Sequence, residues 1–506
     1  MTHTCNLSVH KTRRLMVRNS RLWFPVCFWA MLLLLPGLVQ AQSWRKPLPG
    51  IGTFSSPRVA DLNGDGTADV ILGAGREEFQ ACDSAVMAFD GKSGELLWQV
   101  SARDQIFGSA AIRDLTGDGT ADVVINGRSA ELKAIDGTNG HVLWEFLPAK
   151  NPKAATSRGW YNFYNPQFVP DQDGDGLDDL LVANGGDVMA EPYDPNRPAG
   201  KLVVVSARTG QLLAAAPMPD GKEIYMSVAA VFSPLHQDVR IIFGTGGETI
   251  GGHLYVGSLA QVMAGDLSGA QQLAVSTGKG FIAPPAWVDL TADGEYDIVA
   301  LAVDGRVLAF DGIDGTPLWE RTLPDTEIYS SLAIGNFTGD SIPDFFVSVA
   351  QGDWPKLEWN RQFMLDGQDG RIAYTDSLGF YQTSTAVVAG FSGNGLDEVL
   401  LSVNFQEVNE LYQKFFYNML VVITFDTHEV VQIGQHFTGS NISSTPWIGD
   451  LDHNGFLDII YCHSTNKRHT YTFDGMQVMR LATDIPLYRP LRWGAYMGSK
   501  YDGVYR

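Results

Sequence analysis

Short apolar stretches separated by polar, glycine-rich turns recur along most of the chain. In "SPRVADLNGDGTADVILGAG" (56–75), two apolar stretches flank an acidic loop that begins at Asp61, which predicts two strands joined by the loop. In "AVMAFDGKSGELLWQV" (85–100), an Asp-Gly turn joins two stretches that alternate apolar and polar residues like half-buried strands. One unit is therefore predicted to be a meander of four strands.

Both elements repeat along the chain. The Asp-Gly turn returns in "ELKAIDGTNGHVLWEF", "RVLAFDGIDGTPLWER" and "QFMLDGQDGRIAYTD". The acidic loop returns with starts at Asp61, Asp114, Asp171, Asp289, Asn336 and Asp450, and in a weaker copy at Gly390. A period of this size indicates a propeller or a solenoid.

One unit lacks the acidic loop. The third and fourth starts are 118 residues apart, about twice the usual spacing, and "MSVAAVFSPLHQDVRIIFGTGG" fills the gap. It keeps both strands and an Asp238 at the last acidic position, but Ala230, Phe232 and Pro234 replace the other acids. Eight units averaging about 56 residues fit the blades of a propeller.

These units predict an all-β chain that forms a single eight-bladed β-propeller of four-stranded blades over residues 42–506, with seven blades as the alternative. A solenoid would need polar capping repeats, which neither terminus supplies. "SWRKPLPGIGTFSSPRVADL" parallels "LWERTLPDTEIYSSLAIGNF", in which a fourth strand leads into the next blade. Residues 43–50 are therefore expected to pair with the last blade and close the ring, which removes exposed edges.

Residues 1–41 differ from the rest of the chain. They contain five Lys or Arg and no acid, followed by the apolar run "LWFPVCFWAMLLLLPGLV" and then "VQA". This order is typical of a secretory signal peptide cleaved after Ala41, and an uncleaved membrane anchor is the alternative. We expect an exported protein, periplasmic, cell-surface or extracellular, with no transmembrane segment after cleavage.

The formal net charge is −21, and about −26 without residues 1–41. Nucleic acid and anionic membrane surfaces are therefore poor partners, whereas cations are good ones. Nothing in the sequence indicates an oligomer, and we expect a monomer.

The acidic loops have the composition of cation sites. Oxygen-bearing side chains at positions 1, 3, 5 and 9, with glycine at position 6 for a sharp bend, can surround a hard cation, and Ca²⁺ prefers six to eight oxygen ligands. An EF-hand is excluded, because Leu72 or Ile125 stands where its last Glu would be and a strand follows the loop.

With these loops the sequence resembles the FG-GAP, or integrin-α-like (VCBS-type), propeller repeats over nearly all of residues 51–480. The resemblance implies about five to six structural Ca²⁺ ions in the hairpin between the first two strands of a blade. The implied side-chain ligands of the five best loops are Asp61, Asn63, Asp65 and Asp69; Asp114, Thr116, Asp118 and Asp122; Asp171, Asp173, Asp175 and Asp179; Asp289, Thr291, Asp293 and Asp297; and Asp450, Asp452, Asn454 and Asp458.

Two loops depart from this pattern. The loop with Asn336, Thr338, Asp340 and Asp344 has Ser341 in place of glycine. The loop from Gly390 offers only Ser392, Asn394 and Glu398.

Two cysteines remain after residues 1–41. Cys82 belongs to the first unit and Cys462 to the last, which ring closure would make neighbours. In an oxidising compartment a disulfide between them would lock the ring, and two buried free thiols are the alternative.

The connectors of a four-stranded meander alternate between the two faces of the disc. The acidic loops and the Asp-Gly turns share one face, which we call the loop face. The connectors after the second and fourth strands share the other, the connector face, where lengths vary and ligand-binding residues are expected. Aromatic candidates for stacking and their polar partners are Arg158, Trp160, Tyr161, Tyr164, Glu191, Arg197, Glu248, His253, Asp353, Trp354, Trp359 and Arg361.

Three functions fit this sequence. The first is a binding module that presents the connector face to a protein or a glycan. The second is a polysaccharide-processing lyase, which rests on analogy of fold alone. The third is a quinoprotein dehydrogenase, because the repeats with Trp98, Trp144 and Trp319 resemble the tryptophan-docking repeat of pyrroloquinoline quinone enzymes, although in that repeat the tryptophans join blades. No acid and base can be assigned, so a binding module is the preferred interpretation.

Overall fold

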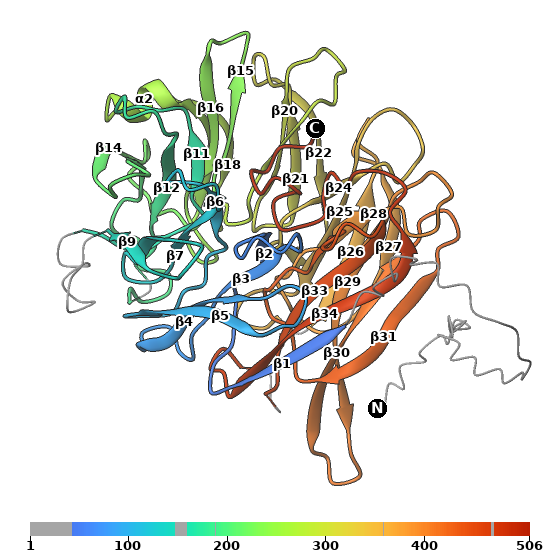
Figure 1. Cartoon of the computed structure of the whole chain (residues 1–506). Helices are drawn as coiled ribbons and strands as arrows, with labels where there is room; N and C mark the ends of the chain where they lie inside the picture. Colours follow the sequence, from blue (N-terminus) through green and yellow to red (C-terminus); the bar gives the residue numbers. More distant parts are fainter. Residues whose placement is uncertain (1–42, 147–158, 188, 358, 467–469) are drawn as a thin grey trace, which may run out of the picture.

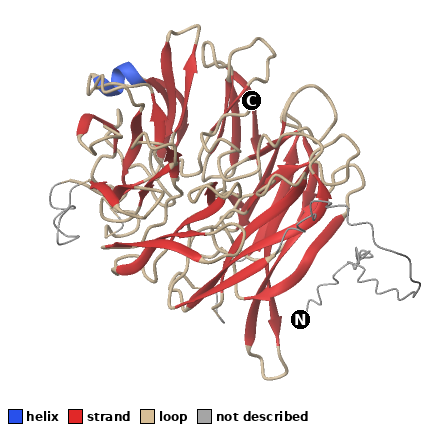
Figure 2. Ribbon diagram, in the orientation of Figure 1, coloured by secondary structure: helices blue, strands red, loops and turns tan. Residues whose placement is uncertain are grey.

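The computed structural model describes residues 43–146, 159–187, 189–357, 359–466 and 470–506. Regular structure in this part of the chain is almost entirely strand (Figure 2). The exception is the short helix α2 (Leu259–Met263), which a capping box of Ser258 and Gln261 begins. None of the helices in the described ranges is long and apolar enough to cross a membrane. The predicted signal peptide lies outside the described residues.

The strands form eight antiparallel sheets, each a meander that we call a blade. Blades 1 to 4 contain β2 (Arg58–Ala60), β3 (Asp69–Gly73), β4 (Cys82–Phe89) and β5 (Leu96–Ala102); β6 (Ala111–Arg113), β7 (Asp122–Asn126), β8 (Leu132–Ile135) and β9 (Val142–Glu145); β10 (Asn162–Phe163), β11 (Gln167–Val169), β12 (Asp179–Gly185), β13 (Lys201–Val205) and β14 (Leu212–Pro217); and β15 (Ala229–Ser233), β16 (Asp238–Gly244), β17 (Gly252–Ser258) and β18 (Gln271–Ser276).

Blades 5 to 8 follow the same order. They contain β19 (Ala286–Val288), β20 (Asp297–Leu301), β21 (Arg306–Phe310) and β22 (Pro317–Thr322); β23 (Thr326–Glu327), β24 (Ala333–Gly335), β25 (Asp344–Gln351), β26 (Trp359–Leu365) and β27 (Ile372–Asp376); β28 (Val387–Ala389), β29 (Glu398–Val408), β30 (Lys414–Ile423) and β31 (Val430–Thr438); and β32 (Trp447–Gly449), β33 (Phe456–Ser464), β34 (Gly475–Pro486) and β1 (Trp44–Pro49). The eight-bladed prediction is confirmed, including blade 4, which lacks the acidic loop.

The N-terminal strand closes the ring as predicted. β1 pairs with β34 in antiparallel register from Trp44 opposite Arg480 to Pro49 opposite Gly475 (Figure 1, blue against red). The indole N–H of Trp44 donates to the carbonyl of Gly91 in blade 1 at 2.8 Å. The seam between the last and the first blade is therefore joined by both backbone and side chain.

The predicted docking tryptophans join successive blades in the same way. Trp98, Trp144 and Trp319 lie on the outermost strands of their blades. Their indole N–H groups donate to turn carbonyls of the next blade, at Gly137 (2.7 Å), Ala207 (2.8 Å) and Gly367 (2.9 Å). Blade 4 uses Arg240 instead, whose guanidinium donates to the carbonyl of Gly312. Each tryptophan ties an outer strand to the next blade, whereas Arg240 does so from the second strand of blade 4.

A belt of polar side chains links the blades around the axis, just before their innermost strands. Ser56 N–H donates to Ser109 Oγ at 2.9 Å, and Ser109 N–H donates to Asn165 Oδ1 at 2.9 Å. Asn165 N–H donates to Ser227 Oγ at 3.4 Å. Thr445 N–H donates to Ser56 Oγ at 3.0 Å, which carries the belt across the closing seam.

The C-terminal tail, residues 487–506, lies in the central channel, and no sequence pattern had predicted it. Its carbonyls accept hydrogen bonds from innermost strands of separate blades. Trp287 N–H donates to Gly503 at 2.9 Å, and Val388 N–H donates to Trp493 at 2.9 Å. The tail therefore fills the channel between the strands β19 and β28.

The predicted disulfide is wrong, because Cys82 and Cys462 are both free thiols. Cys82 packs against the apolar cluster between blades 1 and 2, whereas Cys462 belongs to the cluster between blades 8 and 1. The two side chains thus lie on opposite sides of blade 1. Complete burial raises the pKa of the Cys462 thiol to about 12, so this thiol is unreactive at neutral pH.

Candidate functional site

The acidic loops on the loop face fold around their first residue. Asp61 Oδ1 accepts from Gly64 N–H at 2.8 Å, and Asp61 Oδ2 accepts from Gly66 N–H at 3.0 Å. Gly66 has φ +83°, which glycine adopts without strain. The corresponding pair of carboxylate contacts is present at Asp114 and Asp171, and Asp450 accepts instead from Asn454 N–H and Gly455 N–H. The shared sequence pattern therefore produces a shared bend.

The ninth residue of each loop is buried and ties the loop to its own blade. Asp69 Oδ2 accepts from Leu62 N–H at 2.8 Å, and Asp69 Oδ1 accepts from Gly91 N–H at 2.9 Å. Burial raises the pKa of Asp69 to about 6. The equivalent carboxylates at Asp122, Asp179, Asp297 and Asp344 join the same two segments. This position therefore holds the acidic loop against the turn of the second hairpin.

Two loops gather three carboxylates closely enough to hold a metal ion. Among the described residues, ligand oxygens of Asp171, Asp173 and Asp179 lie within 4.8 Å of one another, and so do those of Asp450, Asp452 and Asp458. These are the loops with aspartate at positions 1, 3 and 9. The other predicted loops have Asn63, Thr116, Thr291 or Thr338 at position 3, which removes one carboxylate from the group.

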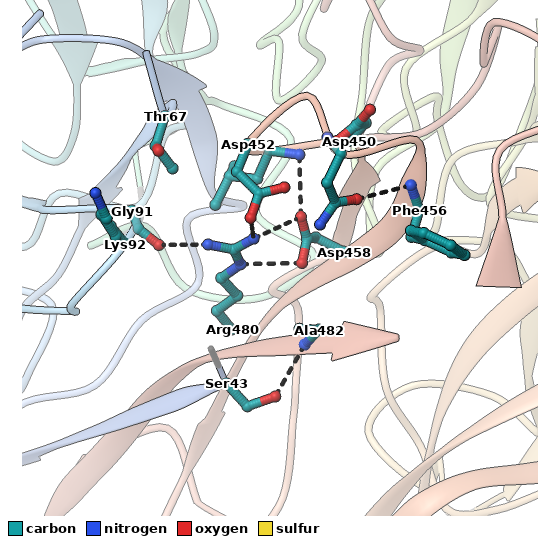
Figure 3. A network of polar contacts seen from close by, with 12 residues as sticks. Ser43, Thr67, Gly91, Lys92, Asp450, Asp452, Phe456, Asp458, Arg480 and Ala482 are labelled. Atoms are coloured by element: carbon teal, nitrogen blue, oxygen red, sulfur yellow. Dashed lines mark hydrogen bonds and ion pairs between the residues drawn. The ribbon is translucent and has the colours of Figure 1, made fainter. Parts of the chain in front are cut away.

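A buried arginine occupies the second of these groups (Figure 3). Arg480 Nη2 is 2.6 Å from Asp452 Oδ2, and Arg480 Nε is 2.9 Å from Asp458 Oδ1. Arg480 Nη1 donates to the carbonyl of Gly91 at 3.2 Å. Because the side chain is 1% exposed, its charge is balanced by these carboxylates rather than by solvent. The last acidic loop thus has an internal cation, which also bonds blade 8 to blade 1.

In the first group, an arginine contacts only the fifth position. Arg208 Nε donates to Asp175 Oδ2 at 3.0 Å, and its side chain is about half exposed. The carboxylates of Asp171, Asp173 and Asp179 have no arginine or lysine partner among the described residues.

The weaker loop from Gly390 is held by internal hydrogen bonds. Glu398 Oε2 accepts from Phe391 N–H at 2.6 Å, and the Ser392 hydroxyl donates to Glu398 Oε1. Asn394 Nδ2 donates to Asp426 Oδ2 at 3.0 Å. Glu398 therefore takes the structural place that aspartate has at position 9 of the other loops.

On the connector face, a cavity of about 230 Å³ lies on the axis of the ring, and we call it the bowl. Its lining comes from the residues just before the innermost strand of each blade, together with Tyr496 of the C-terminal tail. The contributing residues are Phe54, Ser56, Phe107, Ser109, Tyr164, Asn165, Tyr225, Ser227, Ile282, Pro284, Tyr329, Thr383 and Ser443. The polar belt and the tail thus close a channel that would otherwise run through the disc.

Aromatic rings form two arcs at the bowl, in which Phe107, Tyr164, Tyr225 and Tyr329 line the cavity and Tyr381 packs against Tyr329. Across blades 2, 3 and 4, Phe107 and Tyr164 have ring centroids 5.7 Å apart, and Tyr164 and Tyr225 have centroids 6.4 Å apart. Across blades 6 and 7, Tyr329 and Tyr381 have centroids 6.2 Å apart. Burial raises the pKa of Tyr164, Tyr225, Tyr329 and Tyr381, so their hydroxyls stay neutral at physiological pH.

Basic side chains beside these arcs are paired. Arg197 Nη1 lies 3.1 Å from Glu223 Oε1, and it also donates to the Tyr225 hydroxyl at 3.0 Å. Lys279 pairs with Glu327, to which the Tyr329 hydroxyl donates. Their positive charges are therefore balanced inside the protein.

Glu248 belongs to the connector between β16 and β17 of blade 4. This connector is held beside Glu223, because Gly246 N–H donates to the carbonyl of Glu223 at 3.0 Å. After burial, the charge of Glu248 contributes to the raised pKa of Tyr164, Tyr225, Tyr329 and Tyr381. Glu248 has no hydrogen-bond or ion-pair partner in the described part of the chain, and it is partly exposed.

Several predicted ligand-face residues meet at this place. Tyr164 lines the bowl, and Arg197 contacts the hydroxyl of the lining residue Tyr225 as described above. Trp354 N–H donates to Glu327 Oε1 at 2.9 Å, and Asp353 Oδ1 is 3.7 Å from Lys279 Nζ. The Trp354 ring is 6.4 Å from Tyr193 of blade 3, so two long connectors meet.

Other predicted ligand-face residues have local partners. Trp160 packs against Phe146 and under Lys201, and Tyr161 N–H donates to Asn184. The remaining contacts are His253 Nδ1 to Asp220 at 2.7 Å, Trp359 stacked on Phe380 at 4.3 Å, Arg361 over Phe363, and the exposed Glu191, whose carbonyl accepts from Arg197. Arg158 lies outside the described residues.

The sequence predictions missed most of the bowl. Phe54, Phe107, Tyr225, Tyr329 and Tyr381 were not chosen as candidates. Their signal is an aromatic residue two positions before Ser or Thr, in "FSS", "FGS", "YMS", "YSS" and "YQT", directly before the innermost strand. Aligning the units on their acidic loops would have shown that these aromatic residues occupy one equivalent position.

The fold and the site define an eight-bladed β-propeller with acidic loops on one face and an aromatic bowl on the other. Residues 74–228 match the family of FAM234A/B beta-propellers. The chain is 22% identical to Protein FAM234B of Homo sapiens over 388 residues, which is 69% of this chain and 57% of that protein. The chain thus spans a little over half the length of this curated relative.

Solved structures with the same architecture include two quinone-type dehydrogenases. Quinohemoprotein alcohol dehydrogenase ADHIIG from Pseudomonas putida HK5 is similar with a TM-score of 0.54 and 10% identity, over 89% of this chain and 77% of that chain. A europium-containing methanol dehydrogenase is similar with a TM-score of 0.53 and 12% identity, over 87% of this chain and 92% of that chain. At this identity the likeness shows the propeller fold alone.

Proposed function

We propose that this chain is an exported, calcium-stabilised β-propeller that acts as a binding module and takes part of a protein ligand into the bowl. The observation that carries the proposal is the bowl itself, where residues of all eight blades converge around one cavity. Recognition sites with aromatic walls and few polar groups are typical of ligand binding. Export is supported by the signal-like composition of residues 1–41.

A protein is favoured over a glycan because of the charges around the bowl. Neutral sugars need hydrogen-bond partners spread over a surface, whereas Arg197 and Lys279 are already committed to Glu223 and Glu327. Lyase and quinoprotein activities remain predictions, since only the fold supports them.

The binding proposal is tested by filling the bowl. Ser443 lines it, so Ser443→Trp should block ligand entry without removing a blade contact. The matched control is Ser377→Trp, at an exposed position outside the lining. Binding is measured on an array of extracellular proteins and on a glycan array, and we expect protein ligands whose signal Ser443→Trp abolishes and Ser377→Trp retains. Capture of glycans alone would overturn the choice of ligand class, and equal signals from both variants would overturn the bowl as the site.

We further propose that the acidic loops are calcium loops of the FG-GAP type. The strongest site is the loop of Asp171, Asp173 and Asp179, which gathers three carboxylates without a buried cation beside them. Crowded carboxylates repel one another, so an ion that binds the folded loop stabilises the fold. The loop of Asp450 depends less on an ion, because Arg480 already supplies positive charge.

Removing calcium with a chelator is expected to lower the melting temperature. A site contributes about 2.7 kcal/mol when free calcium is at one hundred times its Kd. Asp171→Asn combined with Asp173→Asn should remove most of the calcium-dependent gain in calorimetry, whereas Glu410→Gln at an exposed position should keep it. A melting temperature that changes neither with chelator nor with added calcium would contradict the proposal.

A further inference from the structure

We infer that a second cavity, on the inner side of blades 1 to 4, binds a small organic carboxylate with an apolar body, with Arg58 as its counter-ion. The volume of this cavity is about 300 Å³, and we call it the inner cavity. Its lining shares only Ser109 and Asn165 of the polar belt with the lining of the bowl. The inference therefore goes beyond the proposed function and concerns a separate site.

Two walls enclose the inner cavity. One consists of residues of the innermost strands β2, β6, β11 and β15, and the other consists of residues 500–502 and Arg506 of the C-terminal tail. Gln167 Nε2 donates to the carbonyl of Asp502 at 3.2 Å, and Gln167 Oε1 accepts from Ala230 N–H at 2.9 Å. Blade 3 is thus bonded both to the tail and to blade 4, which holds the two walls in place.

The Arg58 guanidinium lines this cavity as a buried cation. Arg58 is 1% exposed, its Nη1 donates to the carbonyl of Tyr496 at 2.9 Å, and its Nε donates to the carbonyl of Ala110 at 3.3 Å. The guanidinium carbon lies 4.0 Å from the centre of the Tyr501 ring. In the described part of the chain, Arg58 has no carboxylate partner and its Nη2 has no hydrogen-bond partner. Burial lowers the pKa of Arg58 to about 10, so the side chain is still charged at neutral pH.

Two equally buried cations of this protein do have carboxylate partners. The side chains of Arg480 and Lys133 are both 1% exposed, and they lie 2.9 Å from carboxylate oxygens of Asp458 and Glu145 respectively. Burying a charge without a counter-ion is costly. An anion in the inner cavity would supply the counter-charge that Arg58 lacks.

The other charged groups of the lining leave the inner cavity positive. Two further arginines are paired, Arg113 with Asp178 and Arg506 with Asp502. Lys500 is exposed and has no ion pair among the described residues. Together with the buried guanidinium, it gives the lining two unpaired positive charges in a protein of net charge −21. A cation would be repelled here, and a neutral group would leave the guanidinium uncompensated.

Blade 4 supplies an apolar wall where the other blades have acidic loops. Ala230 and Phe232 stand at the first and third positions of the missing loop, and both line the inner cavity. Carboxylates at these positions would repel an anion. Ile112 and Phe168 extend the apolar wall over blades 2 and 3. The wall therefore suits an anion with an apolar body better than a strongly hydrated ion such as phosphate.

The test compares three planar probes of equal size, benzoate, benzamide and benzamidine, by isothermal titration with the full chain in the presence of calcium. We expect benzoate to bind at least about tenfold more tightly than benzamide, because hydrogen bonds between charged groups are stronger than those to a neutral group. Benzamidine should not bind, and inorganic phosphate should bind more weakly than benzoate. Absent benzoate binding, equal binding of benzoate and benzamide, or tighter binding of phosphate would overturn the inference.

Variants locate the binding in the inner cavity. Phe232 is 53% exposed, so Phe232→Asp should keep the fold and, by restoring an acid, weaken benzoate binding at least about fivefold. The matched control is Phe79→Asp, at a 46% exposed position outside the lining, which should change nothing. Arg58→Met should reduce benzoate binding to the level of benzamide, whereas Ser443→Trp in the bowl should leave it unchanged. Benzoate binding that Phe232→Asp does not weaken would overturn the assignment to this cavity, whether or not Arg58→Met folds.

Discussion

Replacing Trp44 with alanine is expected to lower the free energy of unfolding by about 3–5 kcal/mol, the usual cost of removing a large buried aromatic side chain. Trp44 is 8% exposed, packs in the apolar cluster between blades 8 and 1, and donates its indole N–H to Gly91 at 2.8 Å. The variant should open the ring at its seam. Urea unfolding followed by fluorescence measures the loss, and limited proteolysis of residues 43–50 reports the released strand.

The matched control for this seam variant is Trp359→Ala. Trp359 is 49% exposed and stacks on Phe380 where blades 6 and 7 meet, away from the seam between blades 8 and 1. Its replacement should cost under about 1 kcal/mol, as surface substitutions usually do. Equal losses for the two variants would mean that the N-terminal strand does not hold the ring closed.

Ring closure could be predicted because it depends on a local pattern that repeats. "SWRKPLP" resembles "LWERTLP", so residues 43–50 had to be a fourth strand without a blade of its own. The hidden blade 4 was found for the same reason, since its strands keep their spacing although Pro234 interrupts the acidic pattern. A pattern that recurs in each unit can be recognised from one sequence alone.

The disulfide prediction failed because it considered only that the first and last units are neighbours. It did not consider the direction in which each cysteine side chain points. Successive side chains of a strand point to opposite faces, and the two faces of a blade pack against different neighbours. Cys82 faces blade 2, while Cys462 faces blade 1 from the other side. The fact that units 1 and 8 are neighbours does not determine whether the two cysteines face each other.

The bowl was only partly predictable because it depends on how the blades curve into a closed ring. Tyr164 was a candidate because it belongs to a long connector, yet Tyr225 and Tyr329 sit in short segments without a distinctive pattern. These residues meet only because eight blades bring their inner ends to one axis. Likewise, nothing in "RWGAYMGSKYDGVY" indicates a strand, although this segment fills the channel.

The calcium loops stay a prediction, and the structure shows two groups of three carboxylates that could hold an ion. The prediction did not include the arginine that lies in one of them. Arg480 lies 22 residues after Asp458, on the neighbouring strand of the same blade. The register of β33 with β34 places Ile460, two residues after Asp458, opposite Arg480. This pair belongs to the regular part of the pairing, which runs from Asp458 opposite Ala482 to Ser464 opposite Met476.

Replacing Arg480 with methionine is expected to cost about 3–5 kcal/mol, because it leaves Asp452 and Asp458 in a buried site without their cation (Figure 3). The loss also removes the hydrogen bond to Gly91 across the closing seam. A matched control is Arg371→Met, whose side chain is 60% exposed beside Asp366 and should cost under about 1 kcal/mol. Urea unfolding at fixed calcium measures both.

Two further measurements separate charge from packing at this site. Combining Arg480→Met with Asp452→Asn and Asp458→Asn should recover much of the lost stability, because no buried charge is then left unpaired. In Arg480→Met alone, the three carboxylates of Asp450, Asp452 and Asp458 become free to share an ion, so calcium should stabilise this variant more than wild type. If the triple variant is no more stable than Arg480→Met, and calcium gives no extra gain, then Arg480 acts through packing and not as the cation of the last loop.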